Sequence, residues 1–451
     1  MFEKELLIEK NFNSLVEDLR GLLKIESLLT EFKPESNAPF GPKLKETQEY
    51  LEGLLKRDGF TVHGQNNHYS FLEVGEGEET FAVLCHADIV PATGNWQFPP
   101  FGAVINDGKL YGRGTIDNKG PLMASYYAVK TLVEGKVKLK KKLRLIFGYD
   151  EETNMRCVQD YLKNEKMPDY SFAPDGSFPL IYGEKGHFTG EVKGSVKNDL
   201  IVEYNSGTRG NIVPDQVYCI FSKNVKSEFE QFLIDKKVKG EIIDNRYYIY
   251  GKSAHAMQPG VGFNANFPMI EFILSVDANN KIASYLEKYF LNDLKGVKLG
   301  INNSHPEFTD LTINLAIIKY DSDFLRIQFD IRYPGDFHHL VIEEKIKESF
   351  KDANFLLLEK IYISPPHLVD RNSHLVKTLE SVYRNISKDP KTPIYTTGGG
   401  SYARYLKNGV SFGPVFPNDQ DVVHQSDEYI SLEHLKKLYQ IYLESLYLLC
   451  A

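Results

Sequence analysis

The chain has 451 residues, of which 42% are hydrophobic and 25% charged, so it is neither a disordered nor a fibrous protein. Its length favours two domains, because single hydrophobic cores stop growing at roughly 250–300 residues. A formal net charge of −8 argues against nucleic acid and anionic membranes as partners.

The N-terminal segment, up to Leu29, combines charges throughout with leucines at helical spacing, which predicts a helix. It lacks the uninterrupted apolar core of a signal peptide, and the chain has no apolar run of about 18 residues that could cross a membrane. Four scattered cysteines without CxxC spacing predict free, buried thiols. These features favour a cytoplasmic protein.

The first candidate functional residues follow a strand predicted over Phe81–Cys85, an apolar run typical of a strand buried on both faces. His86 and Asp88 come at its carboxyl end, where open α/β sheets place their ligands. They are two residues apart, so on an extended chain their side chains point to the same side and Asp88 can orient His86. An isolated HxD motif is more often structural than functional, so this pair needs support from elsewhere in the chain.

Two acidic motifs come next along the chain. Asp117 lies in a glycine-rich loop ahead of a helix predicted from Leu122 to Leu132, where it suits either a helix cap or a ligand. A strand predicted over Leu143–Phe147 ends in Asp150-Glu151-Glu152. Such adjacent carboxylates suit either a solvated turn or one metal ligand beside one general base.

Further along, Asp175 stands in Ala-Pro-Asp-Gly and His424 in Val-His-Gln near the C-terminus. In this order, HxD, GRGTIDNKGP, DEE, APDG and VHQ, the chain resembles the M20 family of di-metal peptidases, which includes aminoacylases, carnosinases and glutamate carboxypeptidases. The segments Asn211–Pro214, Ile331–Pro334 and Thr397–Arg404 narrow the resemblance to the bacterial dipeptidase branch, of the kind found in lactic acid bacteria and staphylococci. It covers essentially the whole chain.

The resemblance implies a centre of two metal ions that share one carboxylate. The residues that match the ligands of one ion are His86, Asp117 and Asp175, and those that match the ligands of the other are Asp117, Glu152 and His424. Glu151 matches the general base, and Asp88 matches the residue that supports His86. Imidazole and carboxylate ligands without thiolate suit Zn²⁺ or Mn²⁺, with Co²⁺ as a further candidate.

The resemblance also implies residues that hold a small peptide substrate. His255 matches the histidine that reaches over the scissile carbonyl, and Arg332 and Asn211 match the groups that hold the free carboxylate of the substrate. Gly399 and Gly400 belong to a triple glycine that lacks the residues of a phosphate-binding loop, and we expect it to let substrate approach the backbone closely.

The element order predicts an α/β fold with two domains. A mixed-sheet catalytic domain is split by an inserted α+β domain. The family resemblance implies that the catalytic domain is of the zinc-exopeptidase type and that the insertion is a lid. The predicted boundaries are 1–188 for the first part of the catalytic domain, 189–364 for the insertion and 365–451 for the second part. We expect a monomer, with a dimer as the alternative.

Three functions are compatible with the sequence: a di-metal dipeptidase, a deacylase or desuccinylase of N-acyl amino acids, and a non-catalytic metal-binding protein. Glu151, which has no proposed ligand role, argues against the third, because a structural metal site needs no free base. Arg332, Asn211 and the triple glycine favour the first over the second, but only through the resemblance.

Overall fold

The computed structural model describes residues 2–352 and 357–451, which divide into two compact units. Unit 1 comprises the chain up to Tyr182, together with Val369–Tyr395 and Gly400–Ala451. Unit 2 comprises the described residues of Gly183–Leu368 and the short return Thr396–Gly399. The units thus divide after residues 182 and 368, where the sequence placed boundaries after 188 and 364, and the sequence did not anticipate the return segment.

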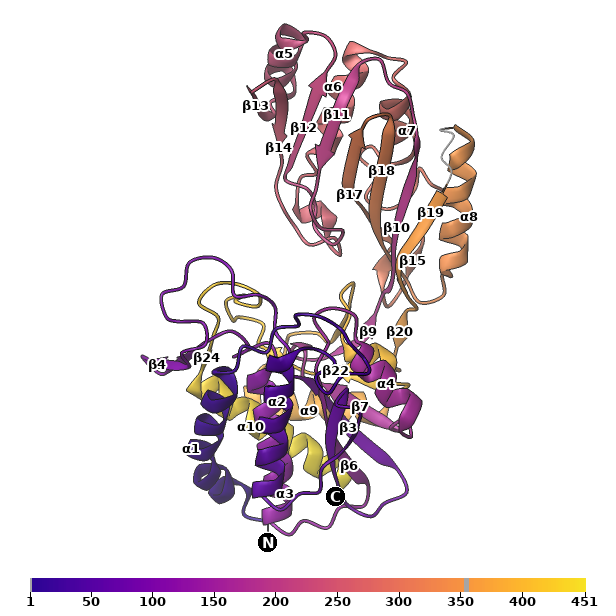
Figure 1. The fold of residues 1–451 in the computed structure, drawn as a ribbon. Helices are drawn as coiled ribbons and strands as arrows, with labels where there is room; N and C mark the ends of the chain where they lie inside the picture. Colours follow the sequence, from indigo (N-terminus) through magenta and orange to yellow (C-terminus); the bar gives the residue numbers. More distant parts are fainter. Residues whose placement is uncertain (1, 353–356) are drawn as a thin grey trace. The chain divides into compact units, whose positions relative to one another are not determined.

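Unit 1 is built on a mixed sheet with a parallel block at its centre (Figure 1). Its strands lie in the order β1 (His63–Gln65), β2 (Tyr69–Val74), β6 (Lys142–Gly148), β3 (Thr80–His86), β7 (Tyr170–Ala173), β22 (Gly409–Ser411) and β9 (Ile181–Glu184). The short β20 (His367–Leu368) and β21 (Tyr395–Thr397) also pair with β9. β6, β3, β7 and β22 are parallel, whereas β2 and β9 are antiparallel to their neighbours. The predicted mixed α/β fold is confirmed.

The described helices of unit 1 are α1 (Lys4–Leu23), α2 (Pro42–Arg57), α3 (Lys119–Glu134), α4 (Arg156–Asn164), α9 (His374–Ser387) and α10 (Leu432–Cys450). α3 packs against β3 and β6, and α1 and α10 pack against α3. Pro121 lies in the first turn of α3, where a missing N–H breaks no intrahelical bond. The predicted N-terminal helix is present as α1 and the helix predicted from Leu122 to Leu132 lies within α3, whereas the sequence did not predict α2 and α4.

Two small sheets lie beside the main one. β24 (Tyr429–Ser431), β5 (Lys109–Tyr111) and β4 (Val104–Asn106) form an antiparallel sheet, and β8 (Gly176–Ser177) pairs in parallel with β23 (Pro414–Val415). A short 3₁₀ helix, η3 (Tyr402–Tyr405), precedes β22. These pairings bring the C-terminal part of the chain next to segments from its first half.

Unit 2 contains an eight-stranded antiparallel sheet (Figure 1). Its order is β13 (Lys239–Ile243), β14 (Arg246–Tyr250), β12 (Gln216–Phe221), β11 (Ile201–Ser206), β17 (Thr312–Asp321), β18 (Phe324–Tyr333), β10 (Gly186–Ser195) and β19 (Leu357–Ser364). The other described elements are α5 (Lys226–Lys236), α6 (Asn266–Val276), α7 (Lys281–Tyr289), α8 (His339–Ser349), η1 (Pro259–Val261), η2 (Phe350–Asp352), β15 (Ser304–His305) and β16 (Thr309–Asp310). α6 packs against β12 and β14, and α8 packs against β19.

Strand β18 shows how unit 2 separates its core from its polar face. Leu325, Ile327, Phe329 and Ile331 alternate along the strand and are fully buried in the apolar core. Asp330 and Arg332 occupy the intervening positions, so they share the opposite face of the sheet. Because side chains two residues apart on a strand share a face, the carboxylate of Asp330 and the guanidinium of Arg332 lie side by side.

No helix among the described residues is long and apolar enough to cross a membrane. All four cysteines are buried and free of disulfides, as the sequence predicted.

Candidate functional site

Three neighbouring parallel strands deliver most of the candidate residues of unit 1. β6, β3 and β7 are adjacent, so their carboxyl ends lie at one edge of the sheet. His86 is the last residue of β3, Glu151 and Glu152 follow β6, and Asp175 follows β7. The sequence predicted that these groups lie together at one edge of the sheet, and the pairing of the strands places them at that edge.

Asp117 lies between two histidines from distant parts of the chain. His86 Nε2 is 2.9 Å from Asp117 Oδ1, and His424 Nε2 is 2.9 Å from Asp117 Oδ2. Each imidazole therefore faces a different oxygen of one carboxylate. His86 is fully buried, whereas the His424 side chain is 48% exposed, so the centre is open on the His424 side.

Two further carboxylates complete the cluster. Glu152 Oε1 is 3.1 Å from His424 Nε2, and Asp175 Oδ1 is 3.8 Å from His86 Nε2. Two sets of possible ligand atoms lie within 4.8 Å of one another: His86, Asp117 and Glu152, and His86, Glu151 and Asp175. Imidazole and carboxylate donors without thiolate fit a borderline or hard divalent cation.

The electrostatics of the cluster favour protons on both histidines and on Glu152. Burial lowers the pKa of His424, but its hydrogen bonds with Asp117 and Glu152 raise that pKa to about 10. Burial also lowers the pKa of His86, and its contacts with Asp117 and Asp175 outweigh this effect and raise it well above its usual range. Burial, followed by the charge of Asp117, raises the pKa of Glu152 to about 7. A divalent cation would take the place of these protons.

The three consecutive acids Asp150, Glu151 and Glu152 do not all face the cluster. Burial, followed by the charge of Asp175, raises the pKa of Glu151 well above its usual range. Asp150 is fully buried and binds Arg156, with its Oδ2 2.6 Å from Arg156 Nε. Asp150 therefore has a structural ion pair, which leaves Glu151 and Glu152 as the two acids of this turn that face the cluster.

Asp88 holds the cluster together in a way that the sequence only partly predicted. His86 Nδ1 is 3.1 Å from the backbone carbonyl of Asp88, which accepts its hydrogen bond, and lies 3.5 Å from the carboxylate oxygen Oδ1. The other carboxylate oxygen accepts the backbone N–H of Glu152 at 3.0 Å. Oδ1 is buried and has no hydrogen-bond partner among the described residues. Asp88 thus orients His86 through its backbone and Glu152 through its side chain.

In unit 2, the guanidinium of Arg332 is already engaged. Its Nε and Nη2 donate to the two oxygens of Asp330 at 2.7 and 3.2 Å, and its Nη1 donates to the carbonyl of Gly398 at 2.8 Å. A guanidinium has five N–H donors, so two are left without a partner among the described residues. Asp330 also contacts His187 Nε2 at 2.6 Å. The sequence analysis missed Asp330, although its spacing of two from Arg332 on a strand signals a shared face.

Asn211 and His255 are both exposed and lie on paired backbone segments. Ile212 forms a bridge with His255, and the Ala256 N–H donates to the carbonyl of Asn211 at 2.9 Å. His255 Nδ1 accepts the N–H of Met257 at 3.1 Å, so a neutral imidazole carries its proton on Nε2. This hydrogen bond therefore favours the His255 tautomer that has its proton on Nε2.

The triple glycine divides between the units. Gly398 and Gly399 belong to unit 2, and Gly400 begins the last segment of unit 1. A Cβ at Gly398 would come within 2.8 Å of the Met257 Cβ, whereas one at Gly399 would meet nothing closer than 3.5 Å. Gly398 is thus needed for the close approach of two segments, while a Cβ at Gly399 would make only ordinary van der Waals contacts.

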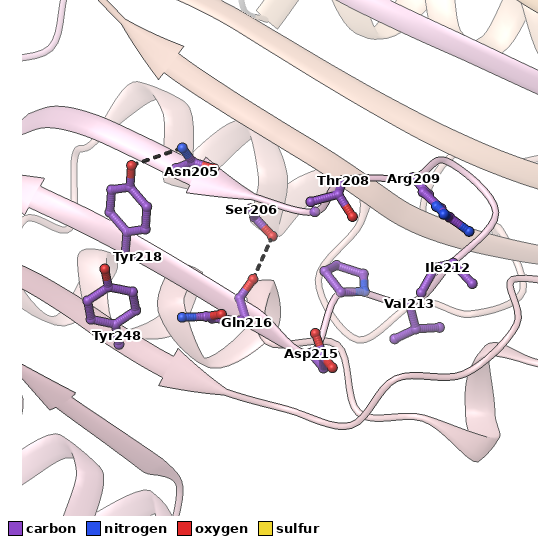
Figure 2. Close-up of a pocket in the computed structure, with 12 residues that line it drawn as sticks. Asn205, Ser206, Thr208, Arg209, Ile212, Val213, Asp215, Gln216, Tyr218 and Tyr248 are labelled. Carbon is purple, nitrogen blue, oxygen red and sulfur yellow. Dashed lines mark hydrogen bonds between the residues drawn. The ribbon is translucent and has the colours of Figure 1, made fainter. Parts of the chain in front are cut away.

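Figure 2 shows a cavity of about 240 Å³ in unit 2. The loop between β11 and β12 lines it together with the rings of Tyr218 and Tyr248. Arg209 and Asp215 project from this loop (Figure 2), and no hydrogen bond or ion pair engages the Arg209 side chain within the described part of the chain. Arg209 lies two residues before Asn211, and the sequence analysis overlooked it although it adjoins a motif.

Comparisons with known proteins agree with this architecture. Residues 82–447 match the model of Peptidase family M20/M25/M40. A protein of Staphylococcus epidermidis, provisionally named a dipeptidase, is 38% identical, and the alignment covers 99% of each chain. A Staphylococcus haemolyticus protein with a similar provisional name is 36% identical over 98% of each chain.

Solved structures share the fold at low sequence identity. Human carnosine dipeptidase 1 is 17% identical with a TM-score of 0.60, and 99% of each chain is covered. The Bacillus subtilis YXEP protein, described as a dinuclear metal binding peptidase from the M20 family, is 11% identical with a TM-score of 0.55 over 98% of this chain and 99% of that one. At such identities the likeness establishes the fold alone.

Proposed function

Because the chain belongs to peptidase family M20/M25/M40 and is therefore a hydrolase of peptide bonds, we propose that it is a dipeptidase with two divalent metal ions bound in unit 1. One observation carries the proposal: the two oxygens of Asp117 each face the Nε2 atom of a different histidine at 2.9 Å. A carboxylate in that position suits a ligand shared by two cations. Relatives named as dipeptidases over the whole length of the chain support the substrate class.

The ligand sets are those that the resemblance implied. His86, Asp117 and Asp175 would hold one ion, and Asp117, Glu152 and His424 would hold the other, as Zn²⁺, Mn²⁺ or Co²⁺. Bound ions supply Lewis acidity toward the peptide carbonyl and toward water. The dinuclear description of the Bacillus subtilis relative supports two ions rather than one.

Glu151 is the proposed general base. Water attacks the peptide carbonyl carbon while the Glu151 carboxylate accepts its proton. The C–N bond then breaks, and Glu151 passes that proton to the leaving amine. Asp88 keeps His86 and the backbone of Glu152 in place through its two hydrogen bonds, so the base works beside a fixed ligand set.

Unit 2 would recognise the substrate. The Nε2–H of His255 would donate to the developing oxyanion, and loss of one such donor typically costs on the order of 10²–10³ in rate. The two remaining N–H donors of Arg332 and the amide of Asn211 would bind the free carboxylate of the substrate. Gly399 and Gly400 would allow its backbone to approach closely.

An assay of metal-free protein restored with Zn²⁺, Mn²⁺ or Co²⁺ tests the proposal. We expect restored protein to hydrolyse dipeptides with free ends much faster than N-acyl amino acids. Faster hydrolysis of N-acyl amino acids would make the protein a deacylase of the same family. Restored protein that hydrolyses neither class would contradict both functions.

A further inference from the structure

Glu428 is a fully buried carboxylate four residues after His424. Its oxygens accept the backbone N–H groups of Gly114 at 3.1 Å, Ile116 at 2.9 Å and Asp117 at 3.2 Å. Converging N–H groups of this kind form an anion-binding concavity in the backbone. One side chain from the C-terminal region therefore binds the loop that carries Asp117.

Two more groups of the same loop reach Glu428. Arg113 is 1% exposed and donates through Nη1 at 2.6 Å, and the hydroxyl of Thr115 contacts Oε1 at 3.4 Å. Gly114 has φ +94°, which favours glycine, and a Cβ there would come within 3.2 Å of Ile89 Cγ2. The loop is thus shaped around the carboxylate.

The backbone of Glu428 binds the same loop. Its carbonyl accepts the N–H of Gly112 at 2.9 Å, and the adjoining strand β24 pairs with β5, where Tyr429 lies opposite Tyr111. His424, by contrast, is half-exposed and lies in a stretch without helix or strand between β23 and β24. Glu428 is therefore a buried anchor close in sequence to an exposed metal-ligand candidate.

Glu428 is not itself a candidate ligand, although it is an acid near the centre. Two carboxylate oxygens offer about four lone-pair sites, and four donors already occupy them: the guanidinium of Arg113 and the backbone N–H groups of residues 114, 116 and 117. No lone pair is left for a cation. The carboxylate acts on the backbone rather than on an ion.

We propose that Glu428 is a positioning residue for the metal centre: it fixes the Asp117 loop against the segment of His424 and so sets the affinity for the ion that Asp117 and His424 would share. The inference rests on the proposed metal centre. Outer partners of ligands typically change metal affinity by about 10–100-fold when they are removed. We expect a change of that size here.

Calorimetric titration of the metal-free protein with Mn²⁺ tests the role. Glu428→Gln keeps the side-chain shape but replaces one acceptor oxygen with a donor, so Mn²⁺ affinity should fall about 10–100-fold for at least one ion. The Mn²⁺ affinity of Glu428→Ala should fall by at least the same factor. Glu433→Gln, which changes an exposed glutamate at the start of α10, should bind Mn²⁺ as the wild type does.

The readout separates positioning from a merely structural role. A structural role would lower the melting temperature of the variant but leave the Mn²⁺ affinity of the folded protein unchanged, and this result would overturn the inference. Hydrogen exchange on the metal-free wild type provides a test without substitution: the amides of Gly114 and Ile116 should be protected, and rapid exchange would also overturn it. Wild-type protein that binds no Mn²⁺, Zn²⁺ or Co²⁺ would refute the proposed metal centre. Variants of Glu428 with unaltered affinity would refute only the positioning role and leave the metal centre in place.

Discussion

At the scale of single residues, surroundings rather than residue type separate the acids of this protein. Asp150, Glu151 and Glu152 are consecutive, yet the first binds Arg156, the third contacts His424, and the second has neither partner. Sequence reasoning assigned Glu151 and Glu152 through a resemblance alone. The structure supplies a physical reason to treat them differently.

Glu151→Gln should uncouple metal content from activity. Glutamine is nearly isosteric, and Glu151 is not a proposed ligand, so both ions should be retained while turnover falls by about 10²-fold or more. Elemental analysis and kcat measured on the same preparation check this. Glu152→Gln is the matched comparison, and it should lose metal. If Glu151→Gln loses metal and Glu152→Gln retains it, the two roles are reversed.

Arg332 and Arg209 can be distinguished by substrates that lack a free carboxylate. Charged hydrogen bonds contribute about 1.5–3 kcal/mol, so wild-type kcat/KM for C-terminally amidated dipeptides should be about 10–100-fold lower than for free dipeptides. Arg332→Lys should reduce that ratio, because a point charge cannot replace the planar guanidinium. Arg209→Ala should leave it unchanged. If Arg209→Ala loses the preference for free over amidated dipeptides and Arg332→Lys retains it, the substrate carboxylate binds at the cavity of Figure 2 instead.

At the scale of elements, the sequence predicted those strands and helices in which the apolar residues follow a regular pattern. The apolar run at Phe81–Cys85 lies within β3, and the strand predicted over Leu143–Phe147 lies within β6, because a buried strand needs uninterrupted or alternating apolar residues. β10 and β19 were missed, since glycine, lysine and glutamate interrupt their apolar pattern. α7 was missed because its nine residues follow a polar turn. Pairing between neighbours, which sequence alone does not supply, stabilises such elements.

Asp330 links β18 to β10, and its ionisation should make unit 2 sensitive to acid. Burial raises the pKa of Asp330, but Arg332 and His187 hold it well below its usual range. Because the folded pKa is below the unfolded value of about 3.9, the stabilisation is complete above about pH 5 and is lost progressively as pH falls below about 4. Urea unfolding at pH 7, 5 and 3 measures this loss.

Asp330→Asn provides the control for that acid sensitivity. Arg332 is 4% exposed and would lose its charged partner, so the free energy of unfolding at pH 7 should fall by about 3–5 kcal/mol. The variant should also lose less stability between pH 5 and pH 3 than the wild type. Asp235→Asn, at an exposed position of α5, should behave as the wild type at each pH. Equal acid sensitivity in wild type and Asp330→Asn would show that other groups govern it.

At the scale of the whole molecule, the element order predicted a domain inserted into the catalytic domain over residues 189–364. It did not predict that Thr396–Gly399 rejoins unit 2. That segment is short and glycine-rich, and its place depends on contacts such as that of Gly398 with Arg332, which lie far away in sequence. Likewise, the hydrogen bonds of Glu428 with the Asp117 loop could not be predicted from its place in the sequence after His424, since they depend on the pairing of β24 with β5.

Metal binding should stabilise unit 1 and leave unit 2 nearly unchanged. Every proposed ligand lies in unit 1, and a ligand that binds only the folded form contributes about 2.7 kcal/mol when its concentration is 100 times Kd. Hydrogen exchange with and without saturating Mn²⁺ should therefore show stronger protection around β3, β6 and β7, with little change in β12, β17 and β18. Asp117→Ala removes the shared ligand and should abolish the difference. Equal Mn²⁺-dependent protection of both units would contradict this prediction. It would mean either that the units unfold together or that ions also bind unit 2. The number of unfolding transitions in calorimetry of the same samples separates these two cases.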